Sequence, residues 1–169
     1  MQGLVRWIEQ ADVGITGAMA RSGVTLLRVS LGVVFLWFGA LKFFPGLSPA
    51  QELAARTLSL LSFGLVPASL GLPLLAAWEC AIGLGLLGGT FLRAILPLLF
   101  LQMLGTMTPL FLFARETFVR FPYAPTLEGQ YIIKNLVLVT AAIVIGATVR
   151  GGGLVPEPGR EPILVKERP

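Results

Sequence analysis

The chain has 169 residues, of which 55% are hydrophobic and only 13% are charged, and its mean hydropathy is +0.82. A soluble domain carries about 25% charged residues, so this composition excludes an ordinary water-facing surface and predicts a protein solvated largely by the lipid bilayer. The net charge of +4 comes from basic residues scattered along the chain, which argues against a nucleic-acid partner, because such proteins gather their basic residues on one polar face.

Residues 1–21 precede the first long apolar run and contain Glu9 and Asp12. This segment lacks the compact apolar stretch of a secretory signal peptide, so we expect it to be kept as a cytoplasmic N-terminal segment. Two interpretations of its structure remain open, a short interfacial helix and a loosely ordered tail.

Four apolar segments follow within residues 22–150. A helix that crosses a bilayer needs about 20 mostly apolar residues, and the segments that meet this length are residues 24–44, 73–92, 94–113 and 131–148. Pro73 suits a first helical turn, and Pro109 is expected to kink the third helix. The predicted fold class is therefore an all-α membrane protein built as a four-transmembrane-helix bundle.

The segments outside the spans have different predicted structures. Residues 45–69 are expected to contain an amphipathic helix on the outer side, between the first two spans. Residues 151–169 are rich in proline, glycine and charge, which predicts a disordered cytoplasmic tail. Lys and Arg are more numerous on the side that holds both termini, so the positive-inside rule favours cytoplasmic termini in a bacterial inner membrane.

Polar residues inside the spans are the candidates for a functional site. Glu79 is the only carboxylate within a predicted span, and a charge at that depth costs about 3 kcal/mol on insertion scales unless it is paired. We therefore expect Glu79 to face the other helices and to pair with Lys134 as first candidate or Lys42 as second. A pocket or ion pair with a function and a purely structural bridge both remain open, and Lys134 could also snorkel to the interface.

Other polar and aromatic side chains accompany this carboxylate. Asn135 and Gln102 lie at a depth similar to that of Glu79, which predicts a polar pocket in the outer half. Trp37 and Trp78 could line this pocket, but interface anchoring or core packing is the commoner role of such residues. Arg28 lies in the inner half, where it either snorkels to lipid phosphate or takes part in the bundle.

Small residues predict where the helices approach one another. In the first span the residues of one face recur every three or four positions, namely Arg28, Gly32, Phe35, Gly39 and Lys42. Glycines on such a face allow a second helix to come close. A second set of small residues, Ala77, Ala81, Gly85 and Gly89, predicts a packing ridge on the second span.

The order of these motifs resembles the DoxX superfamily of small four-helix membrane proteins. The similar stretches are LLRVSLGVVFLWFGALKFFPG, SLLSFGLVP and AAWECAIGLGLLGGTFLR, and the closing EGQYIIKNLVLV resembles the YkgB-like branch. The resemblance covers roughly residues 24 to 150. It implies a membrane subunit of a redox or oxidative-stress-related complex, with a soluble or membrane oxidoreductase subunit as partner.

The resemblance also implies a non-covalent quinone as the cofactor or substrate, with Arg28, Lys42, Glu79 and Lys134 as the matching polar positions. It supplies no established catalytic residue. The single cysteine, Cys80, and the absence of histidine exclude an intramolecular disulfide, a His-ligated haem and a His- or Cys-based zinc site. A small proton-coupled transporter or channel, a non-catalytic anchor for soluble oxidoreductases, and a homo-oligomer stay open as alternatives.

Overall fold

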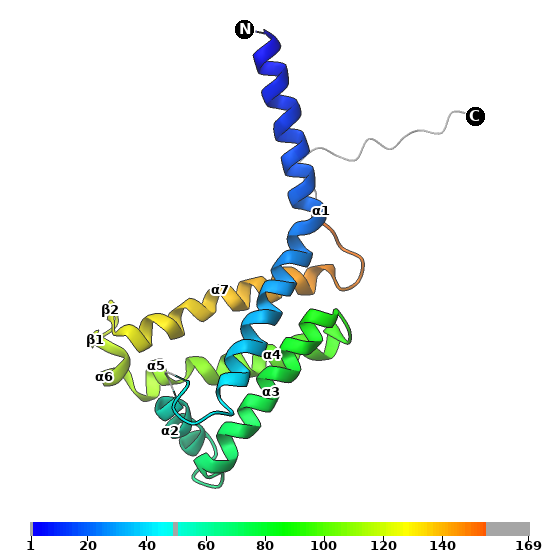
Figure 1. Ribbon diagram of the computed structural model, residues 1–169. Coiled ribbons are helices and arrows are strands. Elements are labelled where there is room, and N and C mark those ends of the chain that lie inside the picture. The colour runs from blue at the N-terminus through cyan, green and yellow to red at the C-terminus, as the bar shows by residue number, and fades with distance from the viewer. Residues whose placement is uncertain (1, 49–50, 155–169) are drawn as a thin grey trace.

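The computed structural model describes residues 2–48 and 51–154, and most of them are helical (Figure 1). The long helices are α1 (Gln2–Leu41), α3 (Ala68–Gly88), α4 (Leu92–Met107) and α7 (Leu127–Thr148). The short elements are the helices α2 (Gln51–Leu61), α5 (Pro109–Leu112) and α6 (Ala114–Thr117), and the strands β1 (Phe118–Arg120) and β2 (Ala124–Pro125), which pair antiparallel.

Within the described residues, four segments are long and apolar enough to cross a membrane. They are Ala11–Leu41, Ala68–Gly88, Leu92–Leu112 and Leu127–Thr148, and they overlap the four spans predicted from sequence. Between 22% and 39% of the residues in the most apolar window of each are buried inside the protein. Most of each apolar surface therefore faces outward, as expected for a multi-pass membrane protein.

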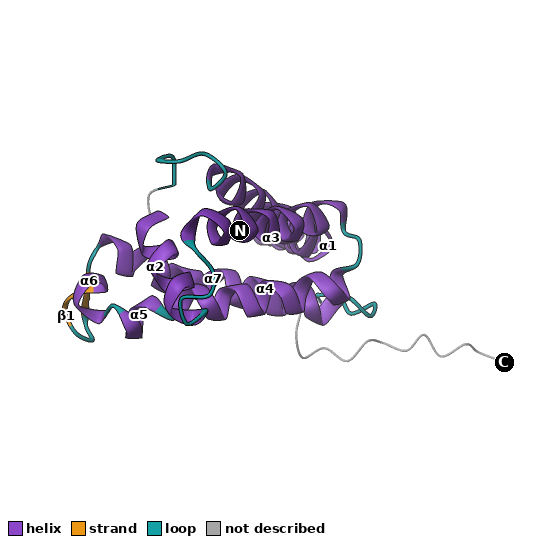
Figure 2. Ribbon diagram, turned by 90° about the horizontal axis from the view of Figure 1, so that it is seen from below, coloured by secondary structure: helices purple, strands orange, loops and turns teal. Residues whose placement is uncertain are grey.

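The long helices pack in two pairs around one apolar core. α1 lies against α3 over most of the length of α3, and α4 lies against α7 (Figure 1; Figure 2). Contacts of α1 with α7 and of α3 with α4 join the pairs. The side chains buried between them belong to all four helices and include Leu31, Phe35, Ile82, Leu86, Leu99, Met103, Ala142 and Ile145.

Glycines set the close approach of α1 and α3, as the first span's glycine face predicted. A Cβ atom added to Gly83 would lie 2.5 Å from the backbone nitrogen of Leu36, and one added to Gly32 would lie 3.0 Å from the nitrogen of Leu87. Real Cβ atoms do not approach other atoms as closely as at Gly83, and the distance at Gly32 is tighter than that of most real Cβ contacts, so a side chain at either position would require its surroundings to shift. This contact holds α1 across α3.

The predicted ridge of small residues on α3 does not form this contact. Ala77 and Ala81 are exposed, and Gly85 packs against Ile95 of α4. The face of α3 that meets α1 instead carries Glu79 and Gly83. The ridge lies off this face because the burial of Glu79 and the close approach at Gly83 together fix the rotation of α3 about its axis.

Two helix ends differ from the sequence prediction. The N-terminal segment is helical but continues the first span without a break, so that α1 has 40 residues and projects well beyond the other helices (Figure 1). α3 begins at Ala68 and places Pro73 inside the helix, where the ring removes one backbone hydrogen bond. Pro73 is thus not a first-turn proline, because Pro67 precedes the helix and caps it in extended geometry.

The other two boundaries have clear local causes. α4 stops before Thr108, and Pro109 opens the separate helix α5, which confirms the predicted disruption at this proline. α7 begins four residues earlier than expected because Thr126 caps it, its Oγ1 accepting a hydrogen bond of 3.3 Å from the Gly129 amide. EGQYIIKN therefore forms the first two turns of α7.

The two ends of the helix assembly are built differently. We call the end that carries α2, α5, α6 and the β-hairpin the loop end, and the end formed by residues 24–28, 89–93 and 145–150 the turn end (Figure 1). α2 lies at the loop end between the first two spans, as predicted. Residues 151–154 follow α7 without regular structure, and the remainder of the predicted disordered tail lies outside the described residues.

Candidate functional site: a polar network between three helices

Glu79 is the centre of a polar network at the loop end. It lies on the face of α3 that meets α1 and α4, and only 6% of its surface is exposed. Its Oε2 forms an ion pair of 2.5 Å with Lys42 Nζ, and its Oε1 accepts a hydrogen bond of 2.7 Å from Gln102 Nε2. Both oxygens of the carboxylate are therefore engaged, which offsets the cost of placing a charge in an apolar environment.

Lys42 is the first residue beyond α1, and its position explains why it reaches Glu79. Its Nζ also donates to the carbonyl oxygen of Phe38 at 3.3 Å, so the ammonium caps the C-terminus of its own helix, where a positive charge is favourable. The side chain is 15% exposed. An ammonium has three hydrogens, and these two contacts leave one for a further acceptor.

Gln102 extends the network along α4. The second hydrogen of its Nε2 reaches Thr106 Oγ1 at 3.0 Å, and the Thr106 hydroxyl in turn donates to the Gln102 carbonyl at 3.0 Å. The Oε1 of Gln102 and the Nε1 of Trp78 are buried without a hydrogen-bond partner among the described residues. Buried polar atoms are nearly always satisfied in folded proteins, so these two atoms distinguish the neighbourhood of Glu79 from ordinary core.

Lys134 does not pair with Glu79, so the first candidate partner was wrong and the second was right. The Lys134 side chain is exposed, and its Nζ lies 5.2 Å from the ring centre of Tyr131. The cause is the rotation of α7, which turns Ile132 inward and places Lys134 away from that face. Asn135 is half-buried on the inward side, but its side chain forms no hydrogen bond with another described residue.

The two tryptophans predicted as pocket walls point in different directions. Trp37 is 65% exposed on α1 and lines an apolar groove of about 380 Å³ with Val33, Leu36, Ala40, Leu41 and Phe44. Trp78 packs against the core. They therefore do not form the two walls of one pocket, because they lie on faces of α1 and α3 that do not meet.

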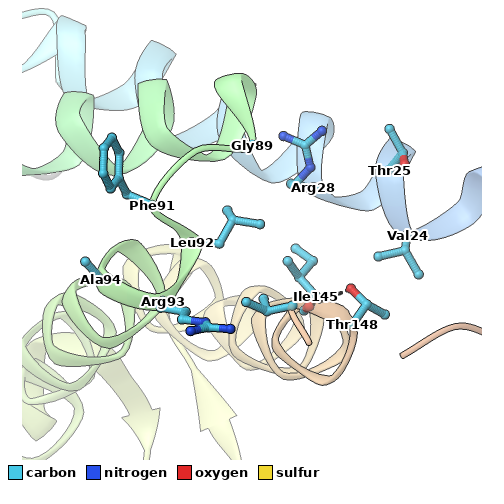
Figure 3. A pocket seen from close by; sticks show the side chains of 11 residues that line it. Val24, Thr25, Arg28, Gly89, Phe91, Leu92, Arg93, Ala94, Ile145 and Thr148 are labelled. Atoms are coloured by element: carbon cyan, nitrogen blue, oxygen red, sulfur yellow. Dashed lines mark hydrogen bonds between the residues drawn. The ribbon is translucent and has the colours of Figure 1, made fainter. Parts of the chain in front are cut away.

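Arg28 lies at the turn end, far along α1 from the network. Its Nη1 donates to the carbonyl oxygens of Leu86 and Leu87, the two residues before Gly88 at the end of α3. The guanidinium borders a cavity of about 530 Å³ (Figure 3). The structure thus separates Arg28 from the Lys42–Glu79–Gln102 network, and neither this cavity nor the apolar groove is lined by Glu79.

Sequence reasoning missed one ion pair at the loop end. Arg56 of α2 forms a two-pronged salt bridge with Glu116 of α6, both contacts at 2.8 Å, and its guanidinium stacks over the Phe113 ring at 4.4 Å. The hydrogen bonds to Glu116 raise the pKa of Arg56 above its usual value. The partners are 60 residues apart, and no spacing signal could have joined them.

The network consists of one carboxylate, one ammonium and one amide, with a hydroxyl beyond the amide. The described residues contain no group of three histidine, cysteine or acidic side chains that could hold a metal ion. A carboxylate between an ammonium and an amide can accept or release a proton while the cation stays in place. The chain matches no protein-family model, no curated protein and no solved structure.

Proposed function

We propose that the chain is a DoxX-like integral membrane protein, a four-helix transmembrane bundle of the bacterial inner membrane with cytoplasmic termini. Four apolar helices that pack around one core support the bundle. The excess of Lys and Arg at the end that holds both termini supports the orientation. The turn end would then face the cytoplasm, and the loop end the outside.

Within this bundle, we propose that the chain serves as the membrane subunit of a redox complex and binds a quinone-like carbonyl compound beside Glu79. The observation that carries the proposal is the Lys42–Glu79–Gln102 network, which joins three apolar helices and is almost fully buried. Ionisable residues inside membrane helices are rare and usually belong to a substrate or proton path.

The residues present fit the polar end of a quinone. A carbonyl oxygen needs a hydrogen-bond donor, and the third hydrogen of Lys42 Nζ, on a side chain that is 15% exposed, supplies one. A bound quinone would supply a two-electron, two-proton acceptor. In this arrangement Lys42 orients the carbonyl, Gln102 holds the carboxylate, and Glu79 Oε2 holds or passes a proton.

A second function, a non-catalytic membrane anchor for a soluble oxidoreductase, is favoured by a different observation. Both oxygens of Glu79 are already engaged within the protein, as expected for a structural bridge between helices. In that case Lys42 and Glu79 would hold the bundle together, and the partner would bind elsewhere.

Quinone titration in nanodiscs separates these two functions. A variant with Trp7→Phe and Trp37→Phe leaves Trp78 as the only tryptophan, directly next to Glu79. We expect menaquinone to quench its fluorescence in a saturable way. Replacing Lys42 and Glu79 together by Met and Gln should abolish saturation without leaving an unpaired charge.

The control is Lys134→Met, which removes a lysine of the same half that the network does not use. It should quench as the parent does. Equal, non-saturable quenching in all three proteins would reflect quinone dissolved in the lipid and would overturn the quinone site. Recovery of a redox partner from mild detergent under that outcome would support the anchor.

A further inference from the structure

The turn end holds a cavity that the proposed function does not use. Its volume is about 530 Å³, and α1, the α3–α4 turn, the start of α4 and the end of α7 all contribute to its walls (Figure 3). Arg28 borders it from α1 and Arg93 from α4. Three segments that are distant in sequence thus bring two guanidinium groups to one cavity.

The guanidinium of Arg28 is held in place by the backbone. Its Nη1 donates to the carbonyl oxygens of Leu86 and Leu87, which leaves Nε and Nη2 without a partner among the described residues. Gly89 makes room for it, because a Cβ there would lie 2.8 Å from Nη1. The same glycine has a φ of 65°, a conformation that favours glycine.

No carboxylate balances these two cations in the part of the chain that the structure describes. Among the side chains that the structure describes, the ion pairs are Lys42–Glu79 and Arg56–Glu116, both at the loop end. Arg93 is exposed and forms no side-chain hydrogen bond with a described residue. The cavity is therefore strongly positive and has donors to spare.

The backbone adds to this positive character. Phe91 precedes α4 with a φ of 52°, and its side chain offers no capping hydrogen bond. The amide groups of Leu92 and Arg93 consequently lack a partner among the described residues, since Ala94 and Ile95 are the first to bond back to Phe91. The positive end of the α4 dipole thus opens beside the two arginines.

The remaining walls indicate what kind of anion fits. Val24, Leu92 and Ile145 are apolar, and Phe91 projects outward with 85% of its surface exposed. Arginine pairs recognise phosphate oxygens in a fork geometry. A headgroup phosphate with its glycerol and upper acyl carbons presents both chemistries at the depth where a span ends.

We propose that the turn-end cavity binds the phosphate group of an anionic membrane phospholipid, with Arg28 and Arg93 as the recognising residues. Arg28 supplies a fixed donor pair from Nε and Nη2, and Arg93 closes over the phosphate from the opposite wall. The choline of a zwitterionic lipid would bring a cation into an already positive hollow, so the site discriminates in favour of phosphatidylglycerol-type headgroups. This proposal does not depend on the quinone site.

Thermal stability in detergent, with phosphatidylglycerol or phosphatidylcholine added, tests the site. A ligand that binds only the folded state raises the melting temperature, so we expect phosphatidylglycerol to raise it more than phosphatidylcholine. Arg93→Gln should reduce this headgroup-specific increment to less than about half. Arg150→Gln, which removes an arginine of the same end that does not line the cavity, should leave it unchanged.

Arg28 also caps α3, so Arg28→Lys is the informative change there. It keeps the charge but loses the fork, and we expect a smaller increment in a protein that still folds. Equal increments in Arg93→Gln and Arg150→Gln, or equal effects of the two lipids on the wild type, would overturn the proposal. An arm with inorganic phosphate distinguishes the sources, because an equal rise sensitive to Arg93→Gln would assign the site to free phosphate instead of lipid.

Discussion

The loop end and the turn end differ in whether their buried or cavity-lining cations have a carboxylate partner. At the loop end Lys42 is paired with Glu79 at 2.5 Å, and Gln102 binds the remaining carboxylate oxygen. At the turn end Arg28 and Arg93 face a shared cavity, and the described residues give them no carboxylate. The described part of the chain thus supplies a counter-charge to Lys42 and none to Arg28 or Arg93.

This difference follows from where the chain places its single intramembrane carboxylate. An ion pair in an apolar environment is tolerable only if its partners are well aligned and hydrogen-bonded. Glu79 of α3 can form such a pair only with a cation that lies at its own depth in the bundle, and that cation is Lys42. Arg28 lies about four helical turns from Lys42 along α1, and its guanidinium meets only carbonyl oxygens. Carbonyl dipoles orient a guanidinium but do not neutralise it, which leaves the turn end prepared for an anion.

The largest effect should come from making the loop end resemble the turn end. Glu79→Leu leaves Lys42 without its counter-charge in a mostly buried position, and we expect it to lower the free energy of unfolding by about 3–5 kcal/mol. An SDS titration in mixed micelles measures this, with the labelling rate of Cys80 as readout. Cys80 is the only cysteine, and it lies next to the network.

The matched control for this change is the double variant Lys42→Met with Glu79→Leu. It removes both charges together, so most of the lost stability should return. A single variant as stable as the wild type would show that Lys42 reaches water freely, and the ends would then differ less than the structure indicates.

The number of membrane-spanning helices was predictable from the sequence, because it depends on the length of the apolar segments. Four runs near 20 apolar residues predicted four spans, and Pro109 predicted the break before α5. Boundaries were harder, because they depend on local capping that a hydropathy profile averages away. Thr126, for example, starts α7 early through a single side-chain hydrogen bond.

The site was only partly predictable, because depth can be read from a sequence but rotation cannot. Glu79, Lys42, Lys134 and Gln102 were all placed at a similar level, and three of these four do meet. Which lysine pairs with the acid depends on the rotation of α7, which is set by packing at Ile132, Ala142 and Ile145. An ion pair such as Arg56–Glu116 cannot be predicted from residue spacing, because its partners lie on different helices far apart in the sequence.

The α1–α3 contact connects the two ends, and breaking it should weaken both of them at once. Gly83→Leu places a side chain where a Cβ already lies 2.5 Å from the Leu36 nitrogen. Overpacking of this kind costs about 1–3 kcal/mol, so we expect a loss of stability smaller than that of Glu79→Leu. The same SDS titration measures it. Because Arg28 and Lys42 both depend on α3, the phosphatidylglycerol increment should fall as well.

Gly105→Leu is the control for the added side chain. A Cβ at Gly105 of α4 meets no atom within 4 Å, so the leucine has room, and the stability of this variant should stay close to that of the wild type. If both glycine variants lost the same stability, chain flexibility and not the α1–α3 approach would be the cause, and the two ends would be independent.

The smallest effect is expected at Lys134, which tests how far the closed network extends at the loop end. Its ammonium is exposed and contacts only the Tyr131 ring, at 5.2 Å from the centre, an interaction that contributes little at exposed sites. Lys134→Met should therefore change the free energy of unfolding by no more than about 0.5 kcal/mol, whereas Lys42→Met leaves Glu79 buried without its cation and should cost several times more. The comparison of these two lysine variants in one SDS titration decides the point, since a large loss at Lys134 would mean that α7 supplies a second cation to Glu79 and that the network spans four helices instead of three.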